Sequence, residues 1–236
     1  MKMKILNALL LMCFLPVFSM AQDQETEKSE YTYKVGDFFL GLSSGVDYNV
    51  NAFRSVATSD FSFEDKGPRY NISFDAGVLV TKRLRPRIEF QYHRLAYGQE
   101  WLGASSASYT TMEYTTAKVN YFGLNFHLDY LLAGLNSKFK IFVSPGLVTE
   151  YSMGVSYNTL KTDGDETSSR FSSLGDYYPK SIAGANLTAI MKYDLNENLG
   201  LTLSPGYTHY LRSFMEVNDN AYQRFNLNVG VEIRIH

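Results

Sequence analysis

Twelve ionisable residues recur at alternate positions within apolar stretches of this chain, and they are the side chains that could do chemistry. They are Asp75, Arg87, Glu89, His93, His127, Asp129, Lys140, Glu150, Lys192, Arg224, Glu232 and Arg234. Carboxylates beside histidines could act as general acids and bases, and a row of charges could guide ions. Acids and bases occur in near balance, so they could equally neutralise one another in salt bridges.

These residues do not follow the spacing of known catalytic or metal-binding motifs. The sequence contains no His-x-His pair and no HExxH motif. His93 and His127 fall near opposite ends of their stretches, and His209 has serines nearby only in loops, so no nucleophile–histidine site is expected. The acidic run at 163–166 lacks the glutamate that closes a calcium loop. We therefore expect no enzyme, cofactor or metal site, with a lipid-modifying enzyme as an unfavoured alternative.

The elements that position these residues are β-strands, as the closing stretch Tyr222–His236 shows. From Phe225 onward its apolar and polar residue types alternate without a break. A period of two directs side chains to opposite faces of a strand, so Arg224, Glu232 and Arg234 share the polar face. One face must therefore meet an apolar medium and the other a polar one.

Seven further stretches show the same alternation. They cover residues 37–48, 70–81, 86–95, 119–131, 139–153, 181–193 and 199–211. Most of them reach the nine to eleven residues, roughly, that a tilted strand needs to cross a membrane. Their connections alternate between short turns and long loops, the long ones being 49–69, 96–116, 154–179 and 212–221. This pattern predicts an all-β fold, an eight-stranded antiparallel up-and-down transmembrane β-barrel with short periplasmic turns and long extracellular loops.

Aromatic residues on the apolar faces gather at the ends of the predicted strands. Those expected at the outer ends are Tyr48, Tyr70, Tyr92, Tyr151, Tyr207 and Phe225. Those expected at the inner ends are Phe38, Tyr130, Phe139 and Tyr193. Such rings mark the two interfaces of a membrane, so they favour a barrel in lipid over a soluble sandwich.

The start of the chain has the features of a secretory signal peptide. A basic start and an apolar run precede a small-x-small cleavage site between Ala21 and Gln22. We therefore expect a signal peptide at 1–21, a flexible periplasmic lead-in at 22–36 and the barrel domain at 37–236. An even strand count after an export signal places both termini in the periplasm, with the barrel in the outer membrane of a Gram-negative bacterium.

Composition and barrel size narrow the function further. The formal net charge of -2 gives no electrostatic case for nucleic acid. Eight strands enclose an interior just wide enough for side chains to fill, and charges buried there must pair. We therefore expect a lumen plugged by salt bridges, with a narrow pore as the alternative. Asp129, Lys140 and Lys192 are candidate partners for the charges of the closing strand.

Three stretches resemble the PorT-like outer-membrane β-barrel family of Bacteroidetes-type bacteria, and more distantly the OmpX-like and OmpA-like barrels. They are YFGLNFHLDYLL from Tyr121, FKIFVSPGLVTEY from Phe139 and the closing NLNVGVEIRIH, together with a signal ending in MAQ. The resemblance implies a role in envelope structure and, for one member, assistance to protein secretion. It carries over no catalytic residue.

The expected role is a non-enzymatic envelope scaffold whose surface loops make interactions. Candidate partners are outer-membrane lipid and lipopolysaccharide, the barrel-assembly machinery during insertion, and a protein bound through the loops. The chain is expected to be a monomer. An accessory of a secretion system and a narrow pore are the alternatives.

Overall fold

The computed structural model describes residues 32–50, 61–65, 69–104, 110–161, 166–171, 181–211 and 223–235. They form ten strands of one sheet. The strands are β1 (Phe38–Val50), β2 (Phe61–Asp65), β3 (Tyr70–Val78), β4 (Leu84–Ala104), β5 (Thr110–Ala133), β6 (Phe139–Lys161), β7 (Glu166–Phe171), β8 (Ser181–Asp194), β9 (Leu199–Tyr210) and β10 (Gln223–Ile235). The predicted signal peptide, its cleavage site and residues 22–31 lie outside the described part of the chain.

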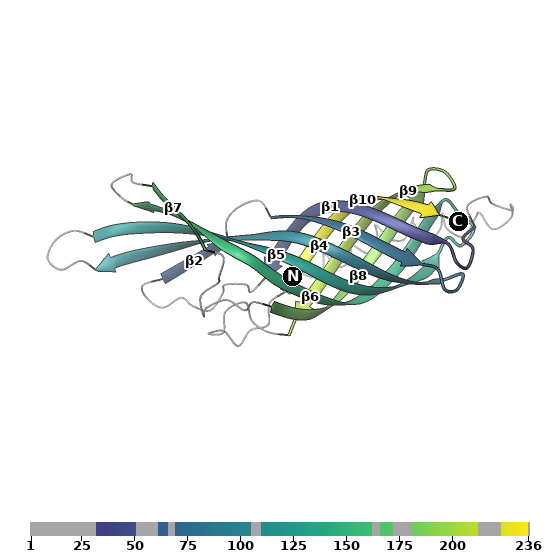
Figure 1. Ribbon diagram of the computed structural model, residues 1–236, viewed down its shortest axis with the longest axis horizontal. Helices are drawn as coiled ribbons and strands as arrows, with labels where there is room; N and C mark the ends of the chain where they lie inside the picture. The colour runs from purple at the N-terminus through teal and green to yellow at the C-terminus, as the bar shows by residue number, and fades with distance from the viewer. Residues whose placement is uncertain are drawn as a thin grey trace, which may run out of the picture.

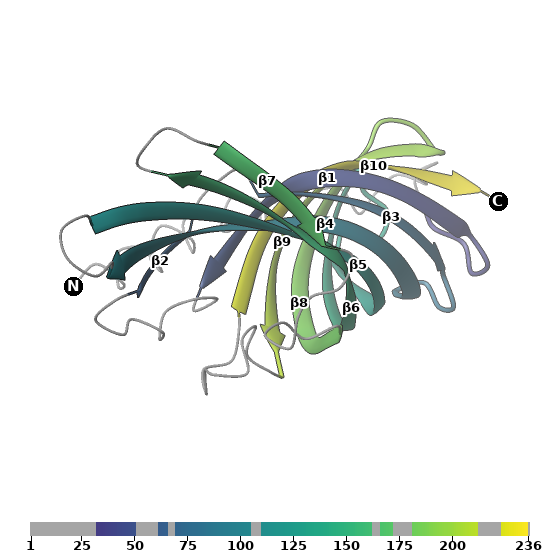
Figure 2. The same cartoon turned by 60° about the vertical axis from the view of Figure 1, so that its left-hand side comes forward.

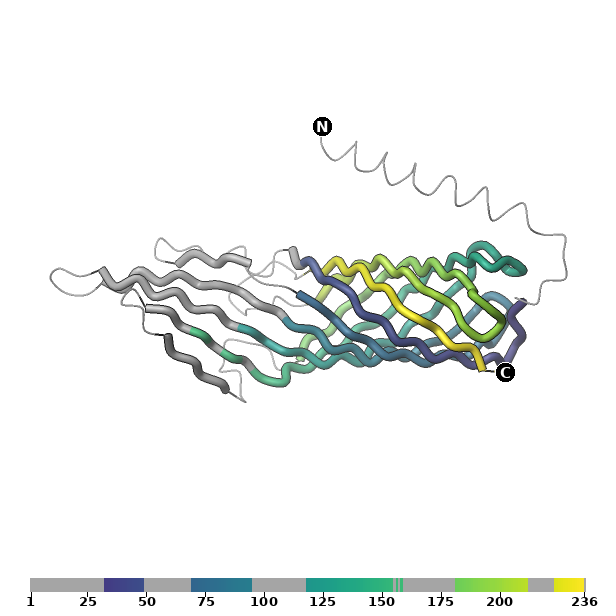
Figure 3. The backbone as a smooth tube through the Cα atoms, turned by 90° about the horizontal axis from the view of Figure 1, so that it is seen from above, coloured from purple at the N-terminus to yellow at the C-terminus, as the bar shows by residue number. Residues whose placement is uncertain are grey.

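Eight of these strands close into an antiparallel barrel in the order β1-β3-β4-β5-β6-β8-β9-β10 (Figure 1). The closing strand β10 pairs with β1 along the whole length of both, from Ile235 opposite Phe38 to Gln223 opposite Val50. Figure 3 shows the two strands side by side. The barrel strands therefore have no free edge, which a strand in lipid could not leave unpaired. The predicted eight-stranded fold is confirmed.

The outer wall of the barrel is apolar and the inner wall is polar. On β10 the apolar residues at alternate positions from Phe225 to Ile235 are exposed, whereas Arg224, Glu232 and Arg234 are buried. The same alternation of burial runs along β3. An exposed apolar belt of this extent needs an apolar medium around it, so the barrel is built to span a membrane. Within the described ranges, no helix is long and apolar enough to cross a membrane.

Strand register gathers the predicted aromatic residues into two rows on the outer wall. In one row, Tyr48 lies opposite Phe225, and Phe225 lies opposite Tyr207 with 4.9 Å between the latter two ring centres. In the other row, Phe139 lies opposite Tyr193. These rows stand near the two ends of the apolar belt, where rings with a polar edge suit a membrane interface.

Three neighbouring strands run far past the barrel. β4, β5 and β6 have 21, 24 and 23 residues, and β2 and β7 pair with the outer parts of β4 and β6. We call this five-stranded sheet, in the order β2-β4-β5-β6-β7, the extension; Figures 1 and 2 show it leaving the barrel on one side. At its base Gly154 has a φ of 126° beside a register shift, just beyond the last pair of β6 with β8. A bulge there bends β6 away from the barrel.

The extension lies within three of the ranges expected to be long loops. The range 49–69 contains β2, the range 96–116 contains the outer parts of β4 and β5, and the range 154–179 contains the outer part of β6 together with β7. Outside the membrane a strand no longer needs an apolar face. The sequence there loses its alternation, so periodicity alone predicts loop.

The opposite end of the barrel carries three short turns, 79–83, 134–138 and 195–198, together with the first residue of β1 and the last of β10. We call it the turn end, and the other the extension end. Thr32–Gly36 pack against this end: the amide of Gly36 donates to the carbonyl of Leu79 at 2.8 Å, and Tyr33 is buried. The last five residues of the predicted lead-in, 32–36, therefore contact the turn end through the buried Tyr33 and the backbone of Gly36.

Candidate functional site

All twelve residues singled out from the sequence lie inside the barrel with buried side chains. They do not form one site. Ion pairs and hydrogen bonds divide them into a middle cluster, a turn-end cluster and an extension-end cluster.

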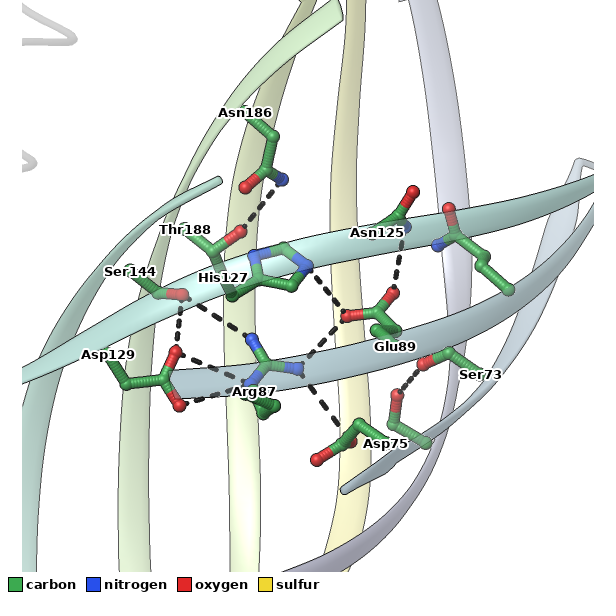
Figure 4. Close-up of polar contacts among 12 residues, drawn as sticks. Ser73, Asp75, Arg87, Glu89, Asn125, His127, Asp129, Ser144, Asn186 and Thr188 are labelled. Carbon is green, nitrogen blue, oxygen red and sulfur yellow. Dashed lines mark hydrogen bonds and ion pairs between the residues drawn. The ribbon is translucent and has the colours of Figure 1, made fainter. Parts of the chain in front are cut away.

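Arg87 is the centre of the middle cluster (Figure 4). Its Nε donates to Asp129 at 3.0 Å and its Nη1 to Glu89 at 3.0 Å, while Asp75 lies 3.8 Å away. Asp129 also accepts from the hydroxyl of Ser144 at 2.5 Å. This guanidinium therefore meets three carboxylates from β3, β4 and β5. Such a pairing satisfies charges that would be costly to bury alone.

Arg85 links the middle cluster to the turn-end cluster. Its Nη2 lies 2.8 Å from Asp129 and its Nη1 lies 2.6 Å from Glu232. Glu232 also pairs with Lys192, and Asp194 pairs with both Lys192 and Lys140. Those pairs close the turn-end cluster.

Sequence reasoning missed Arg85 and Asp194, because both were placed in predicted turns. Each is buried, and each is the partner of predicted lumen charges. Their two-residue spacing from predicted lumen residues was the available signal, because residues two apart on a strand share a face. Arg85 is two residues before Arg87, and Asp194 is two after Lys192. Extending each strand by one or two residues would have placed them in the lumen.

Tyr33, from outside the barrel strands, completes the turn-end cluster. Its ring meets that of Phe39 edge-on at 5.1 Å and stacks on that of Phe142 at 6.4 Å between centres. Three cationic groups lie within 5.3 Å of its ring centre, those of Lys140, Lys192 and Arg234. Burial raises the pKa of the Tyr33 hydroxyl above its ordinary value, so this group stays neutral.

The rings and aliphatic groups around Tyr33 close the lumen at this end. We call this set the turn-end plug; it comprises Tyr33, Phe39, Leu79, Leu131, Phe142 and Ile190. Cations against aromatic faces stabilise such packing by about 0.5 to 2 kcal/mol each. The plug therefore combines apolar contact with the charges of the turn-end cluster.

Glu150 is the centre of the extension-end cluster. It accepts from the hydroxyl of Tyr210 at 2.6 Å and lies 3.0 Å from Arg224 and 2.8 Å from His93. His93 stacks on Tyr121 with 5.3 Å between ring centres. Glu150, His93, Tyr121 and Tyr210 are fully buried. This packing fits a structural role, since a reacting group must reach its substrate.

The two lumen histidines lie in different clusters. His93 contacts Glu150, whereas His127 lies 3.3 Å from Glu89 in the middle cluster. They therefore share no common site, as their positions in the sequence suggested. Within the described ranges, no group of three or more His, Cys, Asp or Glu side chains could hold a metal ion.

A small polar cavity lies between the clusters. Charged residues of β3 and β4 line one side, and Ser, Thr and Asn side chains of β8, β9 and β10 line the other, together with Arg224 and Glu232 of β10. Its volume of about 40 Å³ leaves room for about three water molecules. The side-chain oxygens of Asn125 and Asn228 are buried at its wall with no hydrogen-bond partner among the described residues. The cavity is too small for a substrate and is suited to water.

Several solved outer-membrane barrels are similar to this chain. Neisserial surface protein A is 13% identical over 85% of this chain and 99% of that one, with a TM-score of 0.47. OprG from Pseudomonas aeruginosa is 12% identical over 87% and 99%, with a TM-score of 0.48. Ail, the attachment invasion locus protein of Yersinia pestis, is 8% identical over 86% and 100%, with a TM-score of 0.39.

No protein-family model and no curated protein matches the sequence. The likenesses to solved structures concern the general class of small outer-membrane barrels. They give no support to the finer resemblance to the PorT-like family, or to the secretion role that it implies.

Proposed function

We propose that this protein is a non-enzymatic barrel of the outer membrane of a Gram-negative bacterium, and that its extension is an interaction scaffold facing away from the cell. The observation that supports this proposal is the contrast between the lumen and the outer parts of three strands. The lumen is filled by paired charges and a plug, whereas β4, β5 and β6 continue as a sheet far beyond the apolar belt. Strands outside the belt do not help to span the membrane, so they are available for binding.

Orientation follows from the topology of such barrels. Short turns face the periplasm in bacterial outer-membrane barrels, and long connections face outward. We therefore assign the turn end, with Tyr33, to the periplasm and the extension to the cell surface. Rigid scaffolds commonly display binding segments in this way.

The scaffold role can be tested by shortening the β4–β5 hairpin. Gly98 lies opposite Thr116, so residues 99–115 can be replaced by a two-residue Asn-Gly turn without changing the register of the barrel. Intact cells carrying the full chain, the shortened chain or no chain would be compared for attachment to one another and to host-cell monolayers. We expect the shortened chain to lower attachment to the level of cells without the protein.

Folding of the shortened barrel must be controlled in the same cells. A heat-dependent shift in gel mobility reports a folded barrel, and surface protease treatment reports exposure of the extension. If the folded, shortened chain supports the same attachment as the full chain, the extension is not the binding element and the proposal fails.

A further inference from the structure

Two basic residues lie on the outer wall of the barrel at the extension end. Arg94 follows Ile88, Phe90 and Tyr92 at two-residue intervals on the outward face of β4, and Lys118 is exposed on β5. Arg94 is half-buried. Among residues whose side chains the structure describes, every exposed charged group apart from Lys118 lies at the turn end. Those are Lys34, Lys82, Arg83, Lys138 and Glu197.

Arg94 is held in a fixed position against this wall. Its Nε donates to Oδ1 of Asn120 at 2.9 Å, and the same oxygen accepts from the hydroxyl of Tyr92 at 2.8 Å. Its guanidinium carbon lies 5.7 Å from the ring centre of Tyr70. Within the described part of the chain, no carboxylate pairs with Arg94. The two terminal NH2 groups of this guanidinium are therefore presented to an outside acceptor.

Lys118 lies beside this guanidinium across the β4–β5 pair. Arg94 is opposite Asn120 and Ala96 is opposite Lys118, so Arg94 and Lys118 are diagonal neighbours. Such neighbours are about 7 to 8 Å apart at the backbone, within reach of two long side chains. No carboxylate of the described residues pairs with Lys118 either. One anion between the two side chains could contact both.

The height of this pair matches a headgroup layer. Arg94 is two residues beyond Tyr92, and Lys118 is four residues beyond Phe122, in the direction of the extension. At about 3.3 Å per residue, both lie some 6 to 13 Å beyond the aromatic row along their strands. Aromatic rings mark the edge of the hydrocarbon, so the next layer outward contains the lipid headgroups.

We propose that Arg94 and Lys118, with Asn120 as the positioning residue, bind the phosphate group of a lipid headgroup in the leaflet at the extension end. The planar guanidinium suits two phosphate oxygens at once, and the ammonium adds a second positive charge. This inference rests only on the membrane placement in the proposed function. It is independent of the binding role proposed for the extension.

Native mass spectrometry of the full chain in detergent tests the site, with bis-phosphorylated lipid A as the probe. We expect Arg94→Gln and Lys118→Gln each to weaken binding about fivefold, the size of one basic residue near an anionic surface. The double variant Lys82→Gln with Arg83→Gln removes the same two charge types at the turn end and is the matched control. It should bind as the wild type does.

Two further variants keep the test sharp. Arg94→Lys keeps the charge but loses the planar fork, so it should bind more weakly than the wild type. Asn120→Asp offers Arg94 a carboxylate and should also weaken binding, which provides a readout if the glutamine variants do not fold. Wild-type affinity in both would overturn the assigned geometry.

The lipid source is tested with two competitors. Dephosphorylated lipid A should bind at least fivefold more weakly to the wild type, by the same charge argument. Equal binding of both lipids would overturn the phosphate assignment. Displacement of lipid A by inorganic phosphate at an equal concentration would show a site for free anions and would overturn the lipid assignment.

Discussion

The two ends of the lumen are closed by different means. At the extension end, Glu150, His93, Arg224 and Tyr210 all belong to barrel strands, and they close the lumen with hydrogen bonds and charge. At the turn end, the closure depends on Tyr33, a residue that precedes β1. The extension-end closure of the lumen is therefore made by barrel strands alone. The turn-end closure also uses a segment before β1, and this segment could be removed without breaking any strand pairing of the barrel. The variants below test this difference.

The largest effect is expected at the extension end. Glu150→Gln removes a charge shared by Arg224 and His93. Removing the carboxylate partner of a buried cation lowers the free energy of unfolding by about 3 to 5 kcal/mol. Urea unfolding in phospholipid, followed by circular dichroism, measures the change. Glu197→Gln, in an exposed turn, is the control and should stay within about 0.5 kcal/mol. Equal stability of Glu150→Gln and wild type would show that the cluster is not paired.

A smaller loss is expected at the turn end. Tyr33→Ala removes a buried ring from the plug, but the space lies at the barrel mouth, where water can enter. We expect a loss of about 2 to 3 kcal/mol, below the usual range for a deep aromatic truncation. Tyr33→Phe is the matched control. The Tyr33 hydroxyl has no hydrogen-bond partner among the described residues, so removing it should leave stability unchanged. A destabilised Phe variant would contradict the closure by packing.

The smallest contrast concerns two lumen glycines. A Cβ at Gly45 would come within 2.2 Å of the carbonyl oxygen of Leu227, whereas one at Gly123 would meet nothing closer than 3.4 Å. Gly45→Ala should therefore cost about 1 to 3 kcal/mol through overpacking, and Gly123→Ala should be tolerated. The same urea titration compares them. If both variants unfold at the same urea concentration, the close approach of β1 to β10 is not as tight as the structure has it.

The inner and outer faces of the strands could be predicted from sequence, because a strict period of two decides them. This rule put all twelve charges inside, where the structure has them buried. The pairing of β10 with β1 is what closure of the predicted barrel requires, because an unpaired strand edge is costly in lipid. Fold class was therefore accessible without any knowledge of contacts.

Partners within the lumen were harder to predict, because the stagger between strands decides which charges meet. Lys192 does pair with Glu232, as one of three candidates for the closing strand. Lys140 pairs with Asp194, which was placed in a turn, and Arg234 lies 3.8 Å from the carboxylate of Asp37. Periodicity is weakest at strand ends, so it did not predict that Arg85, Asp194 and Tyr33 contribute to the lumen.

Planar-bilayer conductance of the purified full chain tests the central claim, that the lumen is closed at both ends. We expect no steady conductance from the wild type. A stable, ohmic channel in the wild type would show a continuous water path, and it would contradict the closure by the Glu150 cluster and the turn-end plug.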